Sequence, residues 1–286
     1  MSQDLDRRLN AYRDDLADAR LSGRVKAARF IHGTQATIRI PVCDLMRKPD
    51  ASSGMDTQLK LNDPVTVFDQ ADGWSWVQAK ADNYVGYVPT HAVNLESVVA
   101  PTHRVSVPRT FCYREPDLKK RHSAALSLGT SLCVVDKART RGTDFAQLAS
   151  GDWVFSNHLT ANDKVATDYV SVAESLLATP YLWGGSTAFG IDCSGLVQLS
   201  MAMCGKSVLR DSDMLFETVG AHIDPDGGLK RGDLIYWSGH VAIVCDRDNI
   251  IHANGHTMMV NVENRADAIE RIAYLYSQPT GYKRPA

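Results

Sequence analysis

The spacing of apolar and polar residues changes three times along the chain. Over residues 1 to about 30, apolar residues recur at every third or fourth position, which predicts an amphipathic helix that packs on a later domain. From about 38 to 161, short alternating runs lie between turn residues, which predicts a series of β-strands. Beyond that point the pattern predicts helices over 165–177 and 192–203 and then short strands, an order typical of an α+β domain. The strands expected are 65–68, 74–77 and 84–88 in the middle part, and 234–237, 241–245 and 250–252 near the end.

The strand-rich part contains an internal repeat with an offset of 67 residues, measured from Arg47 to Arg114. Arg47-Lys48-Pro49-Asp50 matches Arg114-Glu115-Pro116-Asp117, and Leu59-Lys60-Leu61 matches Leu126-Ser127-Leu128. A nearly fixed offset indicates two copies of one small domain. The predicted organisation is therefore a helical arm over 1–33, two small β-domains over 34–98 and 99–161, and an α+β domain over 162–286.

Composition and charge exclude some kinds of partner. The 286 residues carry a formal net charge of −2 and are 44% hydrophobic, so nothing favours binding to nucleic acid or to an anionic membrane. The start lacks the apolar stretch of a secretory signal, and no segment approaches the ~20 apolar residues of a membrane span. Six cysteines without a CxxC pair are expected to be reduced thiols. We therefore expect a cytoplasmic monomer without a cofactor or metal.

The sharpest local feature is a glycine-rich loop that runs into Asp192-Cys193-Ser194-Gly195 just before an apolar helical stretch. This order places Cys193 at a helix N-terminus, where backbone N–H groups favour an anion and are expected to lower the pKa of the thiol. A thiolate there would be a nucleophile, with the same N–H groups as oxyanion donors. The alternative is a buried core thiol, but the polar and glycine neighbours are poor core material.

A thiolate nucleophile needs a base, and two histidines on one predicted hairpin are the candidates. His240 begins one strand and His252 lies on the next. If Cys245 pairs with Asn249, the two histidines lie diagonally on one face within reach of each other, which predicts an odd-numbered loop or a bulge. His252 would then accept a hydrogen bond from His240 and fix its tautomer. The alternatives are two structural histidines, or a zinc site with Cys193, for which the usual short ligand spacings are absent.

Five motifs in order resemble the NlpC family of papain-like cell-wall cysteine peptidases. They are Pro180-Tyr181-Leu182-Trp183-Gly184-Gly185, Asp192-Cys193-Ser194-Gly195-Leu196, Arg231-Gly232-Asp233-Leu234, Gly239-His240-Val241-Ala242-Ile243 and Ile251-His252-Ala253. The resemblance implies a papain-like α+β core with Cys193, His240 and His252 as its triad. The two preceding copies resemble bacterial SH3-like β-barrels, so the fold class implied is multidomain.

This domain combination resembles the γ-D-glutamyl-L-diamino acid endopeptidases of peptidoglycan recycling. The resemblance implies hydrolysis of the bond between D-Glu and the diamino acid in small muropeptides that begin with free L-Ala. It leaves open whether the diamino acid is diaminopimelate or lysine. The residues implied to line the cleft are Tyr181, Trp183, Asp192, Ser194 and Ser212, with Asp192 helping to hold the ammonium. The first SH3-like domain would block one end of the cleft and present Asp56 and Tyr84 to the amine.

Three other functions are compatible with these features. A secreted peptidase could remodel intact wall, although the absent signal argues against it. A non-catalytic wall-binding protein could use the SH3-like pair, although Cys193, His240 and His252 are all present. A papain-like core could also hydrolyse amides or transfer acyl groups on other substrates, because a fold does not fix its reaction.

Overall fold

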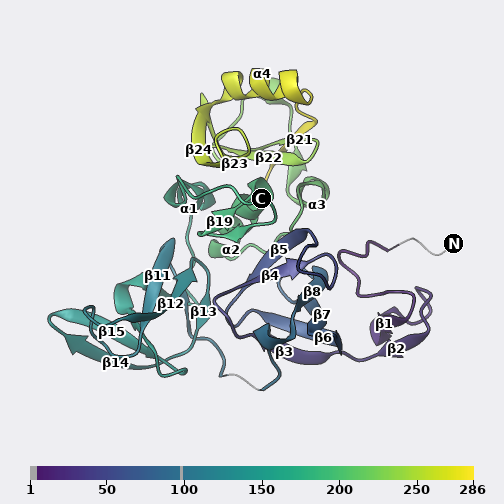
Figure 1. Ribbon diagram of the computed structural model, residues 1–286. Helices are drawn as coiled ribbons and strands as arrows, with labels where there is room; N and C mark the ends of the chain where they lie inside the picture. Colours follow the sequence, from purple (N-terminus) through teal and green to yellow (C-terminus); the bar gives the residue numbers. More distant parts are fainter. Residues whose placement is uncertain (1–4, 97–98) are drawn as a thin grey trace. The chain divides into compact units, whose positions relative to one another are not determined.

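The computed structural model describes residues 5–96 and 99–286 (Figure 1). The chain divides into two compact units, residues 1–162 and 163–286. Across the described ranges, none of the helices combines the length and the apolar character that crossing a bilayer would need.

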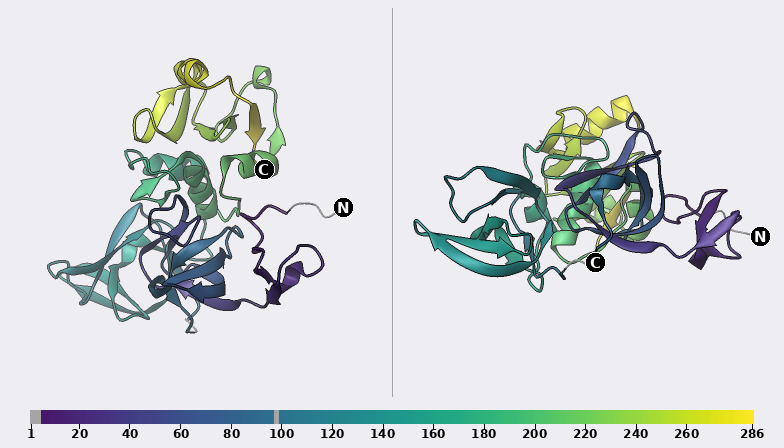
Figure 2. Two further views of the ribbon diagram at one scale, coloured as in Figure 1. Left: turned by 45° about the vertical axis from the view of Figure 1, so that its right-hand side comes forward. Right: turned by 60° about the horizontal axis from the view of Figure 1, so that its bottom comes forward.

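The N-terminal segment is extended where the sequence predicts a helix. Over residues 5–33 the regular elements are β1 (Leu16–Asp18), the 3-10 helix η1 (Ala19–Leu21) and β2 (Arg29–Ile31). The helix is wrong because tertiary contacts override its apolar spacing: Ala11 and Leu16 pack on Phe68 and Trp76. Figures 1 and 2 show β1 and β2, in purple, beside the following sheet. The predicted packing on a later domain is thus present without the helix.

The unit of residues 1–162 contains a sheet of seven strands in the order β5-β4-β8-β7-β6-β3-β9. Its elements are β3 (Thr34–Ile38), β4 (Val42–Met46), β5 (Met55–Lys60), β6 (Pro64–Ala71), β7 (Trp74–Ala79), β8 (Val85–Pro89), η2 (Thr90–Ala92) and β9 (Val93–Asn94). The strands expected at 65–68, 74–77 and 84–88 lie within or overlap β6, β7 and β8. Asp72 and Asn83 lie between these strands with φ of 51° and 65°, a conformation that Asp and Asn tolerate in turns.

The following segment repeats this strand pairing. Its elements are β10 (His103–Val105), β11 (Arg109–Tyr113), β12 (His122–Ser127), β13 (Ser131–Leu132), β14 (Val134–Thr140), β15 (Thr143–Leu148), β16 (Trp153–Phe155), η3 (Ser156–His158) and β17 (Leu159–Ala161). They form the sheets β12-β11-β16-β15-β14 and β13-β10-β17. Register shifts recur at the sequence offset of 67, at Leu45/Met46 and Cys112/Tyr113, and at Val67/Asp69 and Val134/Asp136. Because bulges are specific features of a fold, their recurrence supports the repeat found in the sequence.

The second unit contains four helices around a six-stranded sheet of order β20-β25-β21-β22-β23-β24. Its helices are α1 (Tyr169–Ser175), α2 (Cys193–Met203), α3 (Ser212–Thr218) and α4 (Arg265–Leu275), with the 3-10 helix η4 (Pro225–Gly227). Its strands are β18 (Ser186–Thr187), β19 (Gly190–Ile191), β20 (Ala221–His222), β21 (Leu234–Trp237), β22 (His240–Val244), β23 (Asn249–Asn254), β24 (Met259–Asn264) and β25 (Gly281–Arg284). The helices and strands that the sequence predicts for this part are all present.

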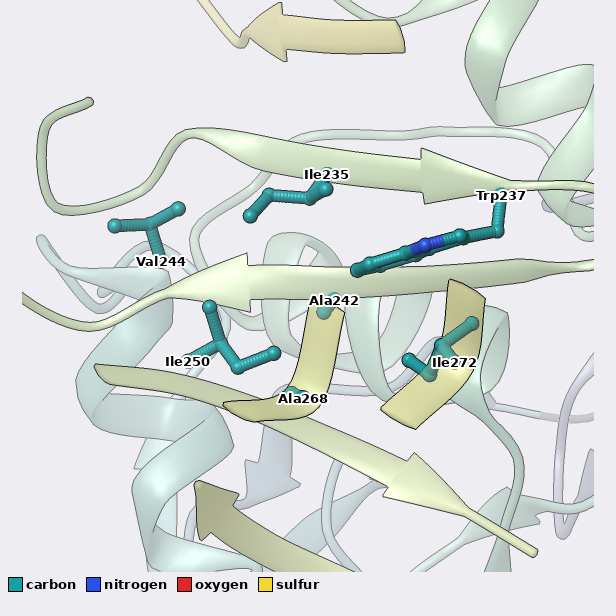
Figure 3. Packing of buried hydrophobic residues seen from close by; sticks show 7 residues of the cluster. All are labelled: Ile235, Trp237, Ala242, Val244, Ile250, Ala268 and Ile272. Atoms are coloured by element: carbon teal, nitrogen blue, oxygen red, sulfur yellow. The ribbon is translucent and has the colours of Figure 1, made fainter. Parts of the chain in front are cut away.

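Apolar residues of the sheet pack against α4 on one face. Figure 3 shows Ala268 and Ile272 of α4 beside Ile235, Ala242 and Ile250 of the sheet, and all five side chains are buried. Helix α2 contacts β22 and β23. The packing therefore brings the start of one buried helix to the strand that begins with His240.

Candidate active site

Helix α2 begins at Cys193, and its start is tightly fixed by its neighbours. The N-cap residue Asp192 accepts a 2.7 Å hydrogen bond from the N–H of Gly195, a standard way to satisfy the first turn of a helix. A Cβ atom on Gly195 would lie 2.4 Å from the carbonyl oxygen of Gly185, so only glycine fits there. Cys193 is buried, with 7% of its surface exposed. Its sulfur contacts the backbone N–H groups of Val241 and Ser194.

Burial controls the ionisation of this thiol. Loss of water raises the pKa of Cys193 to about 12, and the charge of Asp192 adds to the rise. The N–H of Val241, the guanidinium of Arg210 and the N–H of Ser194 act in the opposite direction. The predicted lowering of this pKa is therefore wrong, because desolvation outweighs the helix N-terminus and its donors. A protonated thiol needs a neighbouring base to become a nucleophile.

The hairpin that carries both histidines has the register predicted from the sequence. The N–H of Cys245 donates to the carbonyl of Asn249 over 2.9 Å, and Ile243 pairs with Ile251. The loop between them therefore has three residues, 246–248. With this odd loop, Nε2 of His240 lies 2.9 Å from Nδ1 of His252, so the predicted contact between the two imidazoles is confirmed.

His240 is next in sequence to the residue that contacts Cys193. Its strand begins where the sulfur contacts the N–H of Val241, the next residue. Burial lowers the pKa of His240 to about 3, with a further decrease from His252 and Arg271, so the imidazole is neutral at ordinary pH. When Nε2–H of His240 donates to His252, its Nδ1 keeps a lone pair that can accept the thiol proton.

A buried ion pair holds the loop next to the nucleophile. Arg210, whose side chain is 1% exposed, binds both carboxylate oxygens of Asp192 at 2.9 and 2.7 Å. It also donates to the hydroxyl of Ser194 at 2.8 Å and to the carbonyl of Gly185 at 3.2 Å. The same carboxylate accepts the N–H of Gly184 at 2.9 Å. Asp192 thus joins the start of α2, the glycine-rich loop and Arg210.

Sequence comparison agrees with this geometry. Residues 178–274 match the sequence profile of the NlpC/P60 family, and residues 45–93 match that of the bacterial dipeptidyl-peptidase SH3 domain. Residues 178–274 belong to the NlpC/P60 family. The chain therefore carries a bacterial SH3 domain ahead of an NlpC/P60 domain, as the sequence resemblance implies.

Two curated relatives and one solved structure match much of the chain. Dipeptidyl-peptidase 6 of Lysinibacillus sphaericus is 26% identical over 242 residues, which cover 78% of this chain and 89% of the relative. Gamma-D-glutamyl-L-lysine dipeptidyl-peptidase of Bacillus cereus is 25% identical over 226 residues, covering 70% and 67%. The crystal structure of an NlpC/P60 family protein from Bacillus cereus has a TM-score of 0.74 at 21% identity, covering 88% of this chain and 99% of the other. This last likeness shows a shared fold.

Of the predicted cleft residues, Tyr181, Asp192 and Ser194 lie near Cys193. Tyr181 forms a β-bridge with Ile191, two residues before Cys193. Burial raises the pKa of Tyr181, and the charges of Cys193 and Asp192 raise it further. Ser194 follows Cys193 and contacts Asp192 at 3.2 Å. Trp183 is 68% exposed in the loop before Gly184. Ser212 is the first residue of α3, two positions after Arg210.

The two residues predicted from the SH3 domain belong to the first unit. Asp56 lies on β5 and pairs with Arg47 at 2.6 Å, with its side chain 11% exposed. Tyr84 precedes β8 and is buried, which is the position of a packed aromatic residue. Their predicted contact with a substrate amine stays a prediction.

No pattern in the sequence indicates the role of Arg210. It lies in Leu209-Arg210-Asp211-Ser212, where the family resemblance implies a role for Ser212. An arginine followed by an acidic residue is usually a solvated pair, and its partner here is 18 residues away. Within residues 5–96 and 99–286, no three His, Cys, Asp or Glu side chains converge as metal ligands do.

The lowered pKa of His240 predicts activity at acidic pH. Because its imidazole stays neutral as the pH falls below 6.5, the acid limb of kcat/KM is expected well below pH 6.5, toward the pKa of about 3. As the pH falls from 6.5 toward 3, the native state also loses stability. The cause is that the imidazole of the unfolded chain binds a proton that the buried imidazole excludes. Rates measured from about pH 4 to 8, with circular dichroism to confirm folding, test this. An acid limb centred at or above 6.5 would contradict it.

Proposed function

We propose that the chain hydrolyses the γ-D-glutamyl–L-diamino acid bond of peptidoglycan-derived peptides that carry a free N-terminal L-Ala. The observation that carries the proposal is the contact of 2.9 Å between His240 and His252 at the strand that touches the sulfur of Cys193. The relative from Bacillus cereus is named a gamma-D-glutamyl-L-lysine dipeptidyl-peptidase, which supports the choice of this bond.

The catalytic steps follow from these positions. The thiol proton of Cys193 moves to Nδ1 of His240 as the sulfur attacks the γ-carbonyl carbon of D-Glu. The imidazolium then gives this proton to the leaving amine of the diamino acid, and an acyl-enzyme thioester remains. Water, deprotonated by His240, attacks the thioester and releases the L-Ala-D-Glu product and the thiol. N–H groups in the first turn of α2 stabilise the oxyanion.

Substrate recognition is proposed for the residues around this sulfur. Tyr181 and Ser194 lie beside Cys193 and supply hydroxyl groups, and Trp183 offers an exposed aromatic face. Ser212 is proposed to contact the D-Glu moiety. Asp192 would help to hold the ammonium of L-Ala, although its carboxylate is already paired with Arg210.

The first unit is proposed to contain two SH3-like barrels. The shared strand pairing and the register shifts at one fixed offset support a second copy over residues 99–161. The first copy, with Asp56 and Tyr84, is proposed to block one end of the cleft so that only a free N-terminus fits. A blocked end would restrict the enzyme to released muropeptides, and the cytoplasmic location stays a prediction.

A pair of peptides tests both the bond and the need for a free amine. We expect L-Ala-γ-D-Glu-diaminopimelate to be cleaved to L-Ala-D-Glu and diaminopimelate, as identified by mass spectrometry, while its N-acetylated twin is not. The lysine peptide, run in parallel, decides which diamino acid is preferred, because differences of about 1–3 kcal/mol in transition-state binding give a measurable ratio of kcat/KM.

Intact peptidoglycan serves as the comparison substrate. Equal cleavage of the acetylated peptide, or release of fragments from intact wall, would favour the wall-remodelling function. Absence of cleavage on every wall peptide, with the protein folded, would favour the non-catalytic wall-binding function.

A further inference from the structure

A carboxylate lies behind the two histidines of the active site. Glu263 is on β24, whose register with β23 places it opposite Ile250, on the same face as His252. Its Oε2 lies 3.4 Å from Nε2 of His252, and the side chain of His252 is fully buried. This nitrogen has no other hydrogen-bond partner within residues 5–96 and 99–286. The carboxylate is therefore the acceptor that a proton on Nε2 would use.

Two further groups hold this carboxylate in place. Arg271 of α4 donates to Oε2 over 2.5 Å, and Asn261 donates to Oε1 over 3.3 Å. The side chain of Glu263 is 15% exposed, so its position is set mainly by protein contacts. His252 and Arg271 lower the pKa of Glu263 to about 2, so it is ionised and can only accept hydrogen bonds.

The direction of the hydrogen bond between the two histidines decides whether Nδ1 of His240 can accept a proton. With the proton of His252 on Nε2, its Nδ1 is an acceptor, so His240 donates from Nε2 and keeps a lone pair on Nδ1. With the proton of His252 on Nδ1, or on both nitrogens, Nε2 of His240 must accept, and the proton of a neutral His240 lies on Nδ1. That form of His240 cannot take the proton of Cys193.

We propose that Glu263 is a positioning residue that keeps His252 protonated on Nε2 and thereby keeps the Nδ1 lone pair of His240 available to Cys193. This proposal rests on the catalytic roles proposed above for Cys193, His240 and His252. Glu263 acts through His252 and touches neither substrate nor sulfur. The gap of 3.4 Å suits a free enzyme, because such contacts tighten when substrate binds.

The tautomers of the full-length protein test the proposal without any variant. In a ¹⁵N-histidine sample at neutral pH, two-bond ¹H–¹⁵N correlations are expected to show both His240 and His252 protonated on Nε2 with Nδ1 bare. Single His→Gln variants assign the signals. A His252 protonated on Nδ1 alone, or on both nitrogens, would overturn the proposal, and this result is independent of whether any wall peptide is cleaved.

Glu263→Gln provides the kinetic test. Its amide can donate as well as accept, so the fixed tautomer of His252 should be lost. We expect kcat to fall by roughly 10²-fold, less than the loss of about 10⁴ on disturbing a direct triad orienter, with KM within about twofold. The matched control is Glu270→Gln, the same change at an exposed position of α4, which should leave both constants unchanged. Wild-type kcat in Glu263→Gln would reject the role of Glu263 while leaving the proposed function standing.

Discussion

Replacing Cys193 by alanine is expected to reduce turnover of the muropeptide by at least about 10⁴-fold, as losses of a covalent nucleophile do. His240→Ala should have a comparable effect, because the thiol pKa of about 12 leaves almost no thiolate at neutral pH without a base. Initial rates on L-Ala-γ-D-Glu-diaminopimelate measure both. The substrate should still bind Cys193→Ala, which isothermal titration can show.

The losses of rate in Cys193→Ala and His240→Ala are expected not to add as activation free energies. A variant that lacks both Cys193 and His240 should be no slower than either single variant, because the two groups act in the same step. His252→Ala should cost a smaller factor, about 10²–10⁴, since it orients the base. Equal rates for His252→Ala and wild type would remove it from the triad.

The other end of the same helix offers a matched control. Cys204 is the C-cap residue of α2, so Cys204→Ala changes the same kind of side chain away from the proposed chemistry. It should keep the wild-type rate. Turnover by Cys193→Ala, or equal losses in Cys193→Ala and Cys204→Ala, would show that cysteine chemistry at the start of α2 is not the mechanism.

The parts predicted correctly from the sequence depend on local rules. The period of two along β22 and β23, together with one loop length, fixes which side chains share a face, so the meeting of His240 and His252 follows from residues 240–252 alone. The helix at Cys193 follows from a glycine-rich loop and the capping residue Asp192. The repeat over the first unit is visible because its offset is constant.

The parts predicted incorrectly depend on contacts between distant residues. The spacing of apolar residues over 1–30 fits a helix, but Ala11 and Leu16 instead pack on Phe68 and Trp76. The pKa of Cys193 depends on how much water the whole fold removes from the thiol, which raises the pKa. The motif around Cys193 indicates only the helix N-terminus, which lowers it. The pairing of Asp192 with Arg210 spans 18 residues and has no periodicity to reveal it.

Replacing Arg210 by methionine is expected to reduce the free energy of unfolding by about 3–5 kcal/mol. The change removes one partner of a buried ion pair and leaves the carboxylate of Asp192 uncompensated, which is costly inside a protein. The released loop at Gly184 and Gly185 should also shift relative to Cys193, and a misplacement of about 1 Å can cost about 10²-fold in rate. Chemical denaturation and kcat on the muropeptide measure the two effects.

A second arginine of the same unit provides the comparison for this variant. Arg231 pairs with Asp168 and Glu174, both at 2.8 Å, but its side chain is 39% exposed. Arg231→Met should cost about 1 kcal/mol or less, because exposed pairs contribute little. If burial of the charge is the cause, adding Asp192→Asn to Arg210→Met should recover part of the lost stability, with a coupling of about 0.5–3 kcal/mol. Equal costs for the two arginines, or purely additive losses, would mean that the ion pair does not hold the start of α2.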